Sequence, residues 1–190
     1  MGSVSGVIRT RVGYAGGTTK DPTYYNIGDH SETVQVDFDP SQVTYEELVE
    51  EFFAAHDATR PAYSRQYMSA ILYHDPDQEQ VARSILERLQ EASGETIKTV
   101  IASLSGFYVA EDYHQKYALQ GDGILLAEYR AVYPEMSDFV DSTAVARVNA
   151  YLYGYGTPGQ LSAELDDLGL SEAGKARLQS ASPVGVCPVE

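Results

Sequence analysis

The chain has 190 residues, of which 28 are acidic and 13 are basic, so its formal net charge is −15 at pH 7. This balance argues against a protein that binds the nucleic-acid backbone or an anionic membrane, because like charges repel. The hydrophobic fraction of 43% is ordinary for a globular protein. No stretch approaches the about 20 apolar residues of a membrane span.

The ends of the chain and its cysteine content indicate the compartment. The first residues, Met-Gly-Ser-Val-Ser-Gly, lack the basic region and apolar run of a secretory signal. A single cysteine, Cys187, excludes an internal disulfide and a multi-thiolate zinc site, which fits a reducing environment. We therefore expect an acidic, soluble protein of the cytoplasm.

The first part of the chain alternates between strand-like and helix-like segments. Alternating β-branched residues predict strands at 7–13 and 33–38, separated by a loop rich in glycine and aspartate. Thr44 with Glu47 three residues later forms a capping-box pattern, and Leu48, Phe52 and Phe53 share one face of the helix that follows.

The remaining elements of this part are predicted from the same patterns. We expect a loop at 56–66, strands at 68–73 and 96–103, and a helix at 76–92. Several strands with few helices, and no regular strand–helix repeat, indicate an α+β fold.

The composition changes near Gly121, after which the sequence is typical of helices. The predicted helices cover 125–132, 139–152 and 161–178. We therefore divide the chain into a first domain at 1–120 and a helical C-terminal extension at 121–190.

Candidate functional side chains lie mostly in the predicted loops, where binding groups are commonly found. Tyr24 and Tyr67 can each present a phenol that donates a hydrogen bond, although with 15 tyrosines in the chain a packing role is the alternative. His30 and Glu32 are two residues apart at the start of a strand, so alternation places them on one face. A half-buried Glu32 carboxyl could give a proton to a substrate oxygen, whereas a solvated glutamate is the plainer interpretation.

Residues 111–117 have the polarity of a site but no metal-ligand spacing. His114 has only carboxylates as further candidate ligands nearby, which makes it a weak metal ligand, and we expect no metal and no bound cofactor.

Several short motifs occur together in a characteristic order. They are Val-Gly-Tyr-Ala-Gly-Gly at 12–17, Pro-Thr-Tyr at 22–24, Gly-Asp-His-Ser-Glu at 28–32, Val-Gln-Val at 34–36 with Asp-Pro at 39–40, His-Asp at 56–57, Gln-Tyr-Met-Ser-Ala at 66–70 and Ala-Glu-Asp-Tyr-His-Gln at 110–115. In order and spacing, roughly residues 6–120 closely resemble the peptide-methionine (S)-S-oxide reductase family, methionine sulfoxide reductase A.

This resemblance implies a ferredoxin-like α/β sandwich core and a protein-repair activity in oxidative stress. The reaction is the thiol-dependent reduction of methionine (S)-sulfoxide, free or in proteins, with thioredoxin or another dithiol as reductant. By the family's motifs Glu32 is the proton donor, Tyr24 and Tyr67 hydrogen-bond the sulfoxide oxygen, and Tyr14 and His30 lie near the pocket. Cys187 is a candidate resolving thiol.

The chain departs from the family pattern in two places. The loop at 58–64 is short and lacks the family's aspartate ahead of the second tyrosine. The nucleophilic Gly-Cys-Phe-Trp-Gly motif, which the resemblance places shortly before Gly6, is absent, so the nucleophile is unknown.

Two explanations of the missing nucleophile compete. A chain that starts at an internal methionine would lack the motif although the full protein carries it, and we favour this explanation. An inactive family member that binds oxidised methionine without reducing it is the alternative.

Overall fold

The computed structural model describes residues 1–181, and Cys187 lies outside the described residues. The chain divides into two compact units. The mixed unit comprises 12–35 and 40–111, and among the described residues the helical unit comprises 1–11, 36–39 and 112–181. The prediction of a domain boundary after residue 120 stays a prediction.

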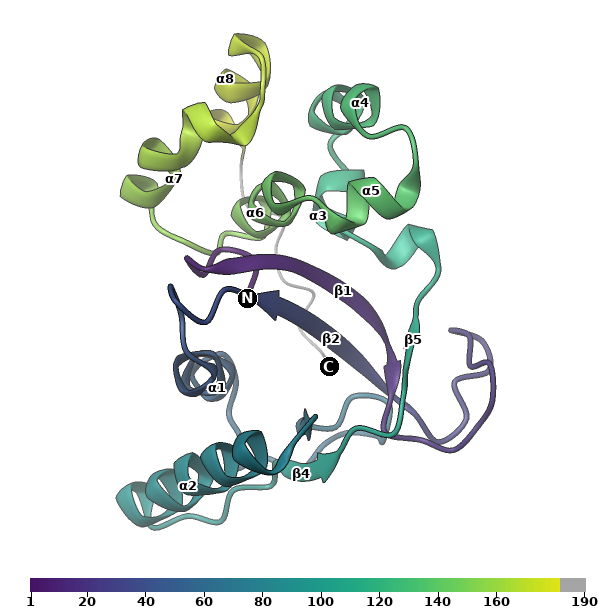
Figure 1. Cartoon of the computed structure of the whole chain (residues 1–190), viewed down its shortest axis with the longest axis vertical. Helices are drawn as coiled ribbons and strands as arrows, with labels where there is room; N and C mark the ends of the chain where they lie inside the picture. The colour runs from purple at the N-terminus through teal and green to yellow at the C-terminus, as the bar shows by residue number, and fades with distance from the viewer. Residues whose placement is uncertain (182–190) are drawn as a thin grey trace. The chain divides into compact units, whose positions relative to one another are not determined.

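Two small sheets carry the strands (Figure 1). The first has the order β2-β1-β5, formed by β1 (Val7–Ala15), β2 (Ser31–Phe38) and β5 (Phe107–Val109). The second pairs β3 (Ala70–Tyr73) with β4 (Val100–Ser103) in parallel. The strands together with the helices confirm the predicted α+β class.

Strand β5 runs antiparallel to β1 within the mixed unit, with Gly13 opposite Val109 and Tyr14 opposite Tyr108. A Cβ atom on Gly13 would collide with the Tyr108 carbonyl oxygen and the Phe107 ring. The close approach of the two strands therefore requires glycine at position 13. The sequence analysis did not predict β5, because its three residues carry too little pattern.

Two helices of the mixed unit begin where the sequence predicts them. Helix α1 (Tyr45–Ala54) starts at Thr44, whose capping box with Glu47 is complete. Helix α2 (Pro76–Ser93) starts after Asp75, whose side chain accepts from the Gln78 amide, and ends at Gly94 in the left-handed conformation. The two helices and β3 share an apolar core: Val49, Phe53, Ala58, Ile71, Ala82 and Ile85.

The helical unit carries the remaining elements, which are η1 (Asp112–His114), α3 (Tyr117–Gln120), α4 (Gly123–Val132), α5 (Met136–Asp141), α6 (Thr143–Leu152), α7 (Pro158–Glu164), η2 (Leu165–Leu168) and α8 (Glu172–Ser180) (Figure 1). Leu119, Leu125, Phe139, Val145 and Val148 have no exposed surface and form the centre of its apolar core. Helix α4 matches the predicted helix at 125–132.

Two predicted helices are wrong in their extent. The predicted helix at 139–152 is divided at Ser142, whose hydroxyl accepts from the Val145 amide and starts α6. The predicted helix at 161–178 is interrupted by Gly169 in the left-handed conformation and by Ser171, which caps α8. In both places a local capping residue overrides the apolar period.

A charged cluster lies within the helical unit. Asp141 binds Arg11 in a bidentate pair, with Arg11 Nε at 2.8 Å from Oδ1 and Nη2 at 3.0 Å from Oδ2. Arg9 Nη1 lies 3.0 Å from Asp141 Oδ2, and Asp37 Oδ2 lies 3.2 Å from both Arg9 Nε and Arg11 Nη1. Each carboxylate therefore bridges two arginines.

Lys116 adds a buried amine to this cluster. The residue is 4% exposed, and its Nζ donates to the Thr10 carbonyl oxygen at 2.5 Å and to Thr10 Oγ1 at 3.0 Å. Burial lowers the pKa of Lys116 to about 8, because a charged ammonium loses its hydration inside the protein.

No helix within residues 1–181 is both long and apolar enough to cross a membrane.

Candidate active site

The three residues that the sequence predicts as catalytic all belong to the mixed unit. Tyr24 sits in a tight turn of the loop between β1 and β2, closed by backbone hydrogen bonds between Thr23 and Asn26. Glu32 is the second residue of β2, and Tyr67 lies in the turn that precedes β3. The Glu32 amide donates to the Gln66 carbonyl oxygen at 2.9 Å, which joins the last two segments.

The side chain of Gln66 links Glu32 with Tyr67. Its Nε2 donates to Glu32 Oε1 at 2.7 Å and to the Tyr67 hydroxyl oxygen at 3.2 Å. The negative charge of Glu32 is the largest cause that raises the pKa of Tyr67, followed by partial burial and by charge and hydrogen-bond interactions with Tyr24. The structure therefore brings Glu32, Tyr67 and Tyr24 together.

These three side chains are accessible to a substrate. Tyr24 is 38% exposed and Tyr67 is 42% exposed, and Glu32 is exposed as well. The half-buried environment that the sequence analysis considered for Glu32 is thus not present in the described chain. A protonated carboxyl group and two phenols that meet at the surface can donate hydrogen bonds and a proton to one polar oxygen.

Tyr14 and Glu111 hold the turn that carries Tyr24 through hydrogen bonds. The Tyr14 ring is 2% exposed, and its hydroxyl donates to Glu111 Oε2 at 2.7 Å. The other carboxylate oxygen accepts from the Tyr24 backbone amide at 3.0 Å. Tyr14, predicted to be near the pocket, therefore reaches the Tyr24 turn through Glu111. The sequence analysis gave Glu111 no such role, because the contact depends on the pairing of β5 with β1.

His30 has a different position from the one expected. The residue lies in the loop before β2 and is 2% exposed, whereas Glu32 is exposed, so the prediction that both share one face is wrong. Nδ1 of His30 accepts from the Gly17 amide at 3.2 Å, and Nε2 faces the Thr19 carbonyl oxygen at 2.8 Å. These partners assign the neutral form protonated at Nε2. His30 fastens the loop and does not face the exposed carboxylate.

The same loop is held by Asp29 and Arg65. The Asp29 carboxylate accepts from the backbone amides and hydroxyls of Thr18 and Thr19, at 2.8 to 2.9 Å. These donors hold the pKa of the Asp29 carboxyl well below its usual range. Arg65 donates to the carbonyl oxygens of Asp29 at 2.6 Å and Gly16 at 2.8 Å, which ties the loop to the segment that carries Gln66 and Tyr67.

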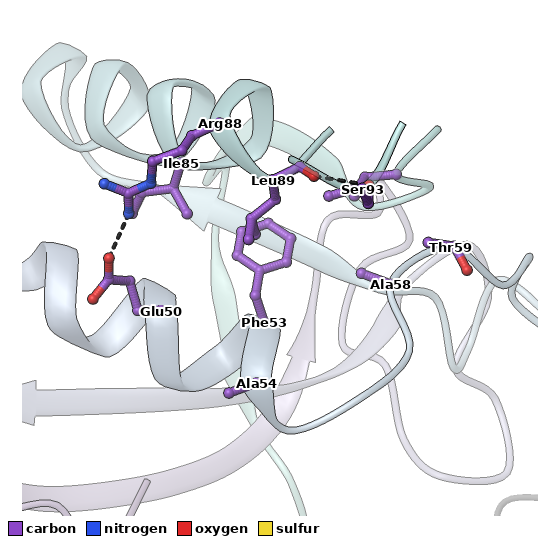
Figure 2. Close-up of a pocket in the computed structure, with 10 residues that line it drawn as sticks. Glu50, Phe53, Ala54, Ala58, Thr59, Ile85, Arg88, Leu89 and Ser93 are labelled. Atoms are coloured by element: carbon purple, nitrogen blue, oxygen red, sulfur yellow. Dashed lines mark hydrogen bonds and ion pairs between the residues drawn. The ribbon is translucent and has the colours of Figure 1, made fainter. Parts of the chain in front are cut away.

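A pocket of about 500 Å³ lies elsewhere in the mixed unit, between α1 and α2. Phe53, Ile85 and Leu89 supply much of its apolar lining, and Arg88 pairs with Glu50 beside it (Figure 2). None of Glu32, Tyr24 and Tyr67 lines this pocket. The predicted catalytic side chains therefore lie outside the space between α1 and α2.

A metal or thiol centre is not part of the described site. No group of three or more histidine, cysteine, aspartate or glutamate side chains within residues 1–181 is arranged to hold a metal ion. The cysteine that the sequence analysis considered as a resolving thiol, Cys187, belongs to the part of the chain that the structure does not describe.

Comparison with known proteins gives a consistent match. The family model described as peptide methionine sulfoxide reductase matches residues 1–142 and so continues past the boundary predicted at residue 120. A peptide methionine sulfoxide reductase of Drosophila melanogaster is 43% identical over 173 residues, which cover 90% of this chain and 69% of the relative. A relative from Methanococcoides burtonii, named for the same activity, is 48% identical over 126 residues, covering 60% of this chain and 82% of the relative.

Solved structures agree with this match. Methionine sulfoxide reductase A of Corynebacterium diphtheriae is 39% identical, with a TM-score of 0.55, over 63% of this chain and 66% of the solved chain. Mxr1 of Saccharomyces cerevisiae in its reduced form is 30% identical, with a TM-score of 0.57, over 62% of this chain and 72% of the solved chain. The chain thus spans about two thirds of these solved proteins.

Proposed function

The chain belongs to the peptide methionine sulfoxide reductase family, and we propose that it takes part in the thiol-dependent reduction of methionine (S)-sulfoxide, free or in proteins. One observation carries the assignment of roles. Glu32 and Tyr67, which lie far apart in the sequence, share the Gln66 amide, and Tyr24 interacts with Tyr67. In this proposal Glu32 supplies a proton, and the two phenols hydrogen-bond the sulfoxide oxygen.

The reaction requires the sulfoxide oxygen to leave sulfur. A thiolate attacks the sulfoxide sulfur while the oxygen accepts a proton, and the oxygen is transferred to the thiol as a cysteine sulfenic acid. The methionine sulfur is reduced and the cysteine sulfur is oxidised, so the electrons balance. Phenol hydrogen bonds withdraw electron density from the S–O bond and so favour both the attack and the protonation.

The nucleophile of this reaction is the open part of the proposal. Residues 1–181 contain no cysteine, and the family resemblance places the nucleophile shortly before the position of Gly6. The intact mass of the natively expressed protein, with peptide mapping of its amino terminus, tests this. A cysteine-bearing peptide ahead of Gly6 supports the enzyme, whereas a mass that matches residues 1–190 contradicts it.

Thioredoxin or another dithiol is the proposed reductant, and Cys187 is the proposed resolving thiol. The Cys187 thiol would condense with the sulfenic acid to form a disulfide and release water, and the dithiol of the reductant would then reduce this disulfide to two thiols while forming its own disulfide. Replacement of Cys187 with serine should slow turnover with thioredoxin more than turnover with excess dithiothreitol. An equal loss of rate with both reductants would contradict the resolving role.

We propose protein repair in the cytoplasm as the setting of this activity.

A second function belongs to a different class. Glu32, Tyr24 and Tyr67 are exposed and can bind a sulfoxide oxygen without a thiol, which supports as the alternative a module that recognises oxidised methionine without reducing it. Titration of the chain with a peptide carrying methionine (S)-sulfoxide discriminates between the two functions. Binding without turnover supports the module, and turnover supports the enzyme.

A further inference from the structure

We propose that Gln66 is a positioning residue, whose amide holds the Glu32 carboxylate against Tyr67 and sets the direction in which the paired phenols donate. Gln66 touches neither substrate nor a reacting atom in this assignment, and it acts through Glu32 and Tyr67. The inference deepens the proposed function and rests on it, because Glu32 and Tyr67 are the groups that it would orient.

The amide nitrogen of Gln66 makes both of the contacts that matter here. Gln66 Nε2 donates to Glu32 Oε1 at 2.7 Å. The amide nitrogen has two protons and no free lone pair. Its second contact, at 3.2 Å from the Tyr67 hydroxyl, must therefore also be a donation.

This second donation decides what the Tyr67 hydroxyl does. Because its oxygen accepts from Gln66, its own proton points away from the amide. Tyr67 also shares a side-chain hydrogen bond with Tyr24 that raises the pKa of Tyr67, as expected when the Tyr67 hydroxyl is the donor. The order of donation therefore runs from Gln66 to Tyr67 and on to Tyr24. A sulfoxide oxygen that enters here would accept from the Tyr24 hydroxyl at the end of this order, and from the Tyr67 hydroxyl once its proton turns from Tyr24 to the substrate.

The backbone keeps Gln66 in register with Glu32. The Gln66 carbonyl oxygen accepts from the Glu32 amide at 2.9 Å, so the same two residues are joined by both main chain and side chain. The Tyr67 amide donates to the Ser64 carbonyl oxygen at 3.2 Å, which fixes the turn that presents Tyr67. With the main chain held in this way, replacing the side chain should change the side-chain contacts and leave the turn in place.

The test compares Gln66→Met with Gln80→Met in the full chain. Methionine keeps the length of glutamine but has no N–H donor. Gln80 lies exposed on α2 and serves as the matched control. The first measurement is the affinity for a short peptide carrying methionine (S)-sulfoxide, with the (R)-sulfoxide peptide as the ligand control. Gln66→Met should weaken binding of the (S) form about tenfold, the scale for two lost hydrogen bonds, and Gln80→Met should not change it.

The second measurement does not require the substrate. Tyrosine labelled with ¹³C at the ζ position reports the titration of Tyr67, identified by loss of its signal in Tyr67→Phe. Glu32→Gln should lower the pKa of Tyr67, because the Glu32 charge raises it. The same change made together with Gln66→Met should have less than half of this effect, because the carboxylate is no longer held against the phenol. A purely structural role of Gln66 would not alter this coupling.

The outcomes separate the two proposals. Unchanged coupling and unchanged affinity in Gln66→Met overturn the positioning role, whatever becomes of the proposed function. If the unaltered chain fails to bind the (S)-sulfoxide, the proposed function fails, and the coupling alone decides the role of Gln66. If Gln66→Met does not fold, Gln66→Leu replaces it. That variant removes the donor without adding a charge, so the same losses are expected.

Discussion

The core of the helical unit and the site on the mixed unit are built by opposite means. Phe139, Leu119 and Leu125 have no exposed surface and pack in one apolar core. Tyr24 and Tyr67, by contrast, are 38% and 42% exposed and are held by hydrogen bonds to neighbouring polar groups. Burial of apolar side chains stabilises the fold, whereas directed hydrogen bonds fix the orientation of the site residues. Changes in the first region should therefore affect unfolding, and changes in the second should affect ligand chemistry.

Phe139→Ala should have the largest effect on stability. The ring is fully buried and its loss leaves a cavity, so the free energy of unfolding should fall by about 3–5 kcal/mol. Urea denaturation followed by circular dichroism measures this. Val132→Ala, at a position 62% exposed in the same unit, is the control and should cost less than about 0.5 kcal/mol. A similar loss in the free energy of unfolding for Phe139→Ala and Val132→Ala would contradict the stabilising role of burial in this unit.

Lys116 sharpens the comparison, because it is a buried polar group in the helical unit. Its pKa falls from 10.5 to about 8 on folding, so between these values the unfolded chain binds more protons at this residue. The free energy of unfolding that depends on Lys116 should therefore rise with pH across this window. Below it both states are protonated, and the cost of burying the ammonium is fully present.

The measurement for Lys116 is the difference in stability between the unaltered chain and Lys116→Met. That difference should rise by up to roughly 3 kcal/mol from pH 8 to pH 10.5, since each pKa unit corresponds to about 1.4 kcal/mol. The charged neighbours, Arg11 with a raised pKa and Asp141 with a lowered pKa, do not titrate in this range. A flat difference would show that the amine is not buried in solution.

Glu32→Gln tests the opposite region. In a form that carries the family's nucleophilic cysteine, turnover of methionine (S)-sulfoxide should fall about 100-fold, the scale for loss of one acid–base group. Because Glu32 is exposed, the free energy of unfolding should change by less than about 0.5 kcal/mol. Tyr24→Phe and Tyr67→Phe should each cost less, with a larger joint loss. An unchanged rate in Glu32→Gln would rule out the proton-donor role.

Thr44→Ala should have the smallest effect of this series. The hydroxyl of Thr44 accepts from the Glu47 amide, and its loss should destabilise the chain by about 1 kcal/mol, seen as a lower Tm. Thr44→Ser keeps the hydroxyl and serves as the control. A full loss in Thr44→Ser as well would show that the methyl group matters and not the cap.

Local patterns predict the local structure well here. The capping box at Thr44 and the helix start at Pro76 are both confirmed. Strand β5 was missed because it is defined by pairing with β1, which no local pattern encodes. The break at Ser142 had a signal, since Ser142 followed by Thr143 is a plausible helix start, but the apolar period concealed it.

The candidate site shows the same difference between features that the sequence predicts and contacts that depend on tertiary structure. The family motifs identify Glu32, Tyr24 and Tyr67 as catalytic candidates, and the structure places them together. The supporting contacts could not be predicted in this way. Gln66 reaches Glu32 across 34 residues, and Glu111 reaches Tyr24 across 87. Such contacts depend on tertiary placement, and so does the buried position of His30, whose ring nitrogens contact Gly17 and Thr19.

Hydrogen bonds to the Asp29 carboxylate should protect amide protons of an exposed loop from hydrogen exchange, as in a helix or strand. The amide protons of Thr18 and Thr19 both donate to it, so they should exchange with deuterated solvent more slowly than amides of a solvated loop. Because the pKa of Asp29 is held well below its usual range, this protection should persist in mildly acidic solution. Asp29→Ala should release both amides together, which would make the stretch ahead of Tyr24 a separate opening unit in a hydrogen-exchange map.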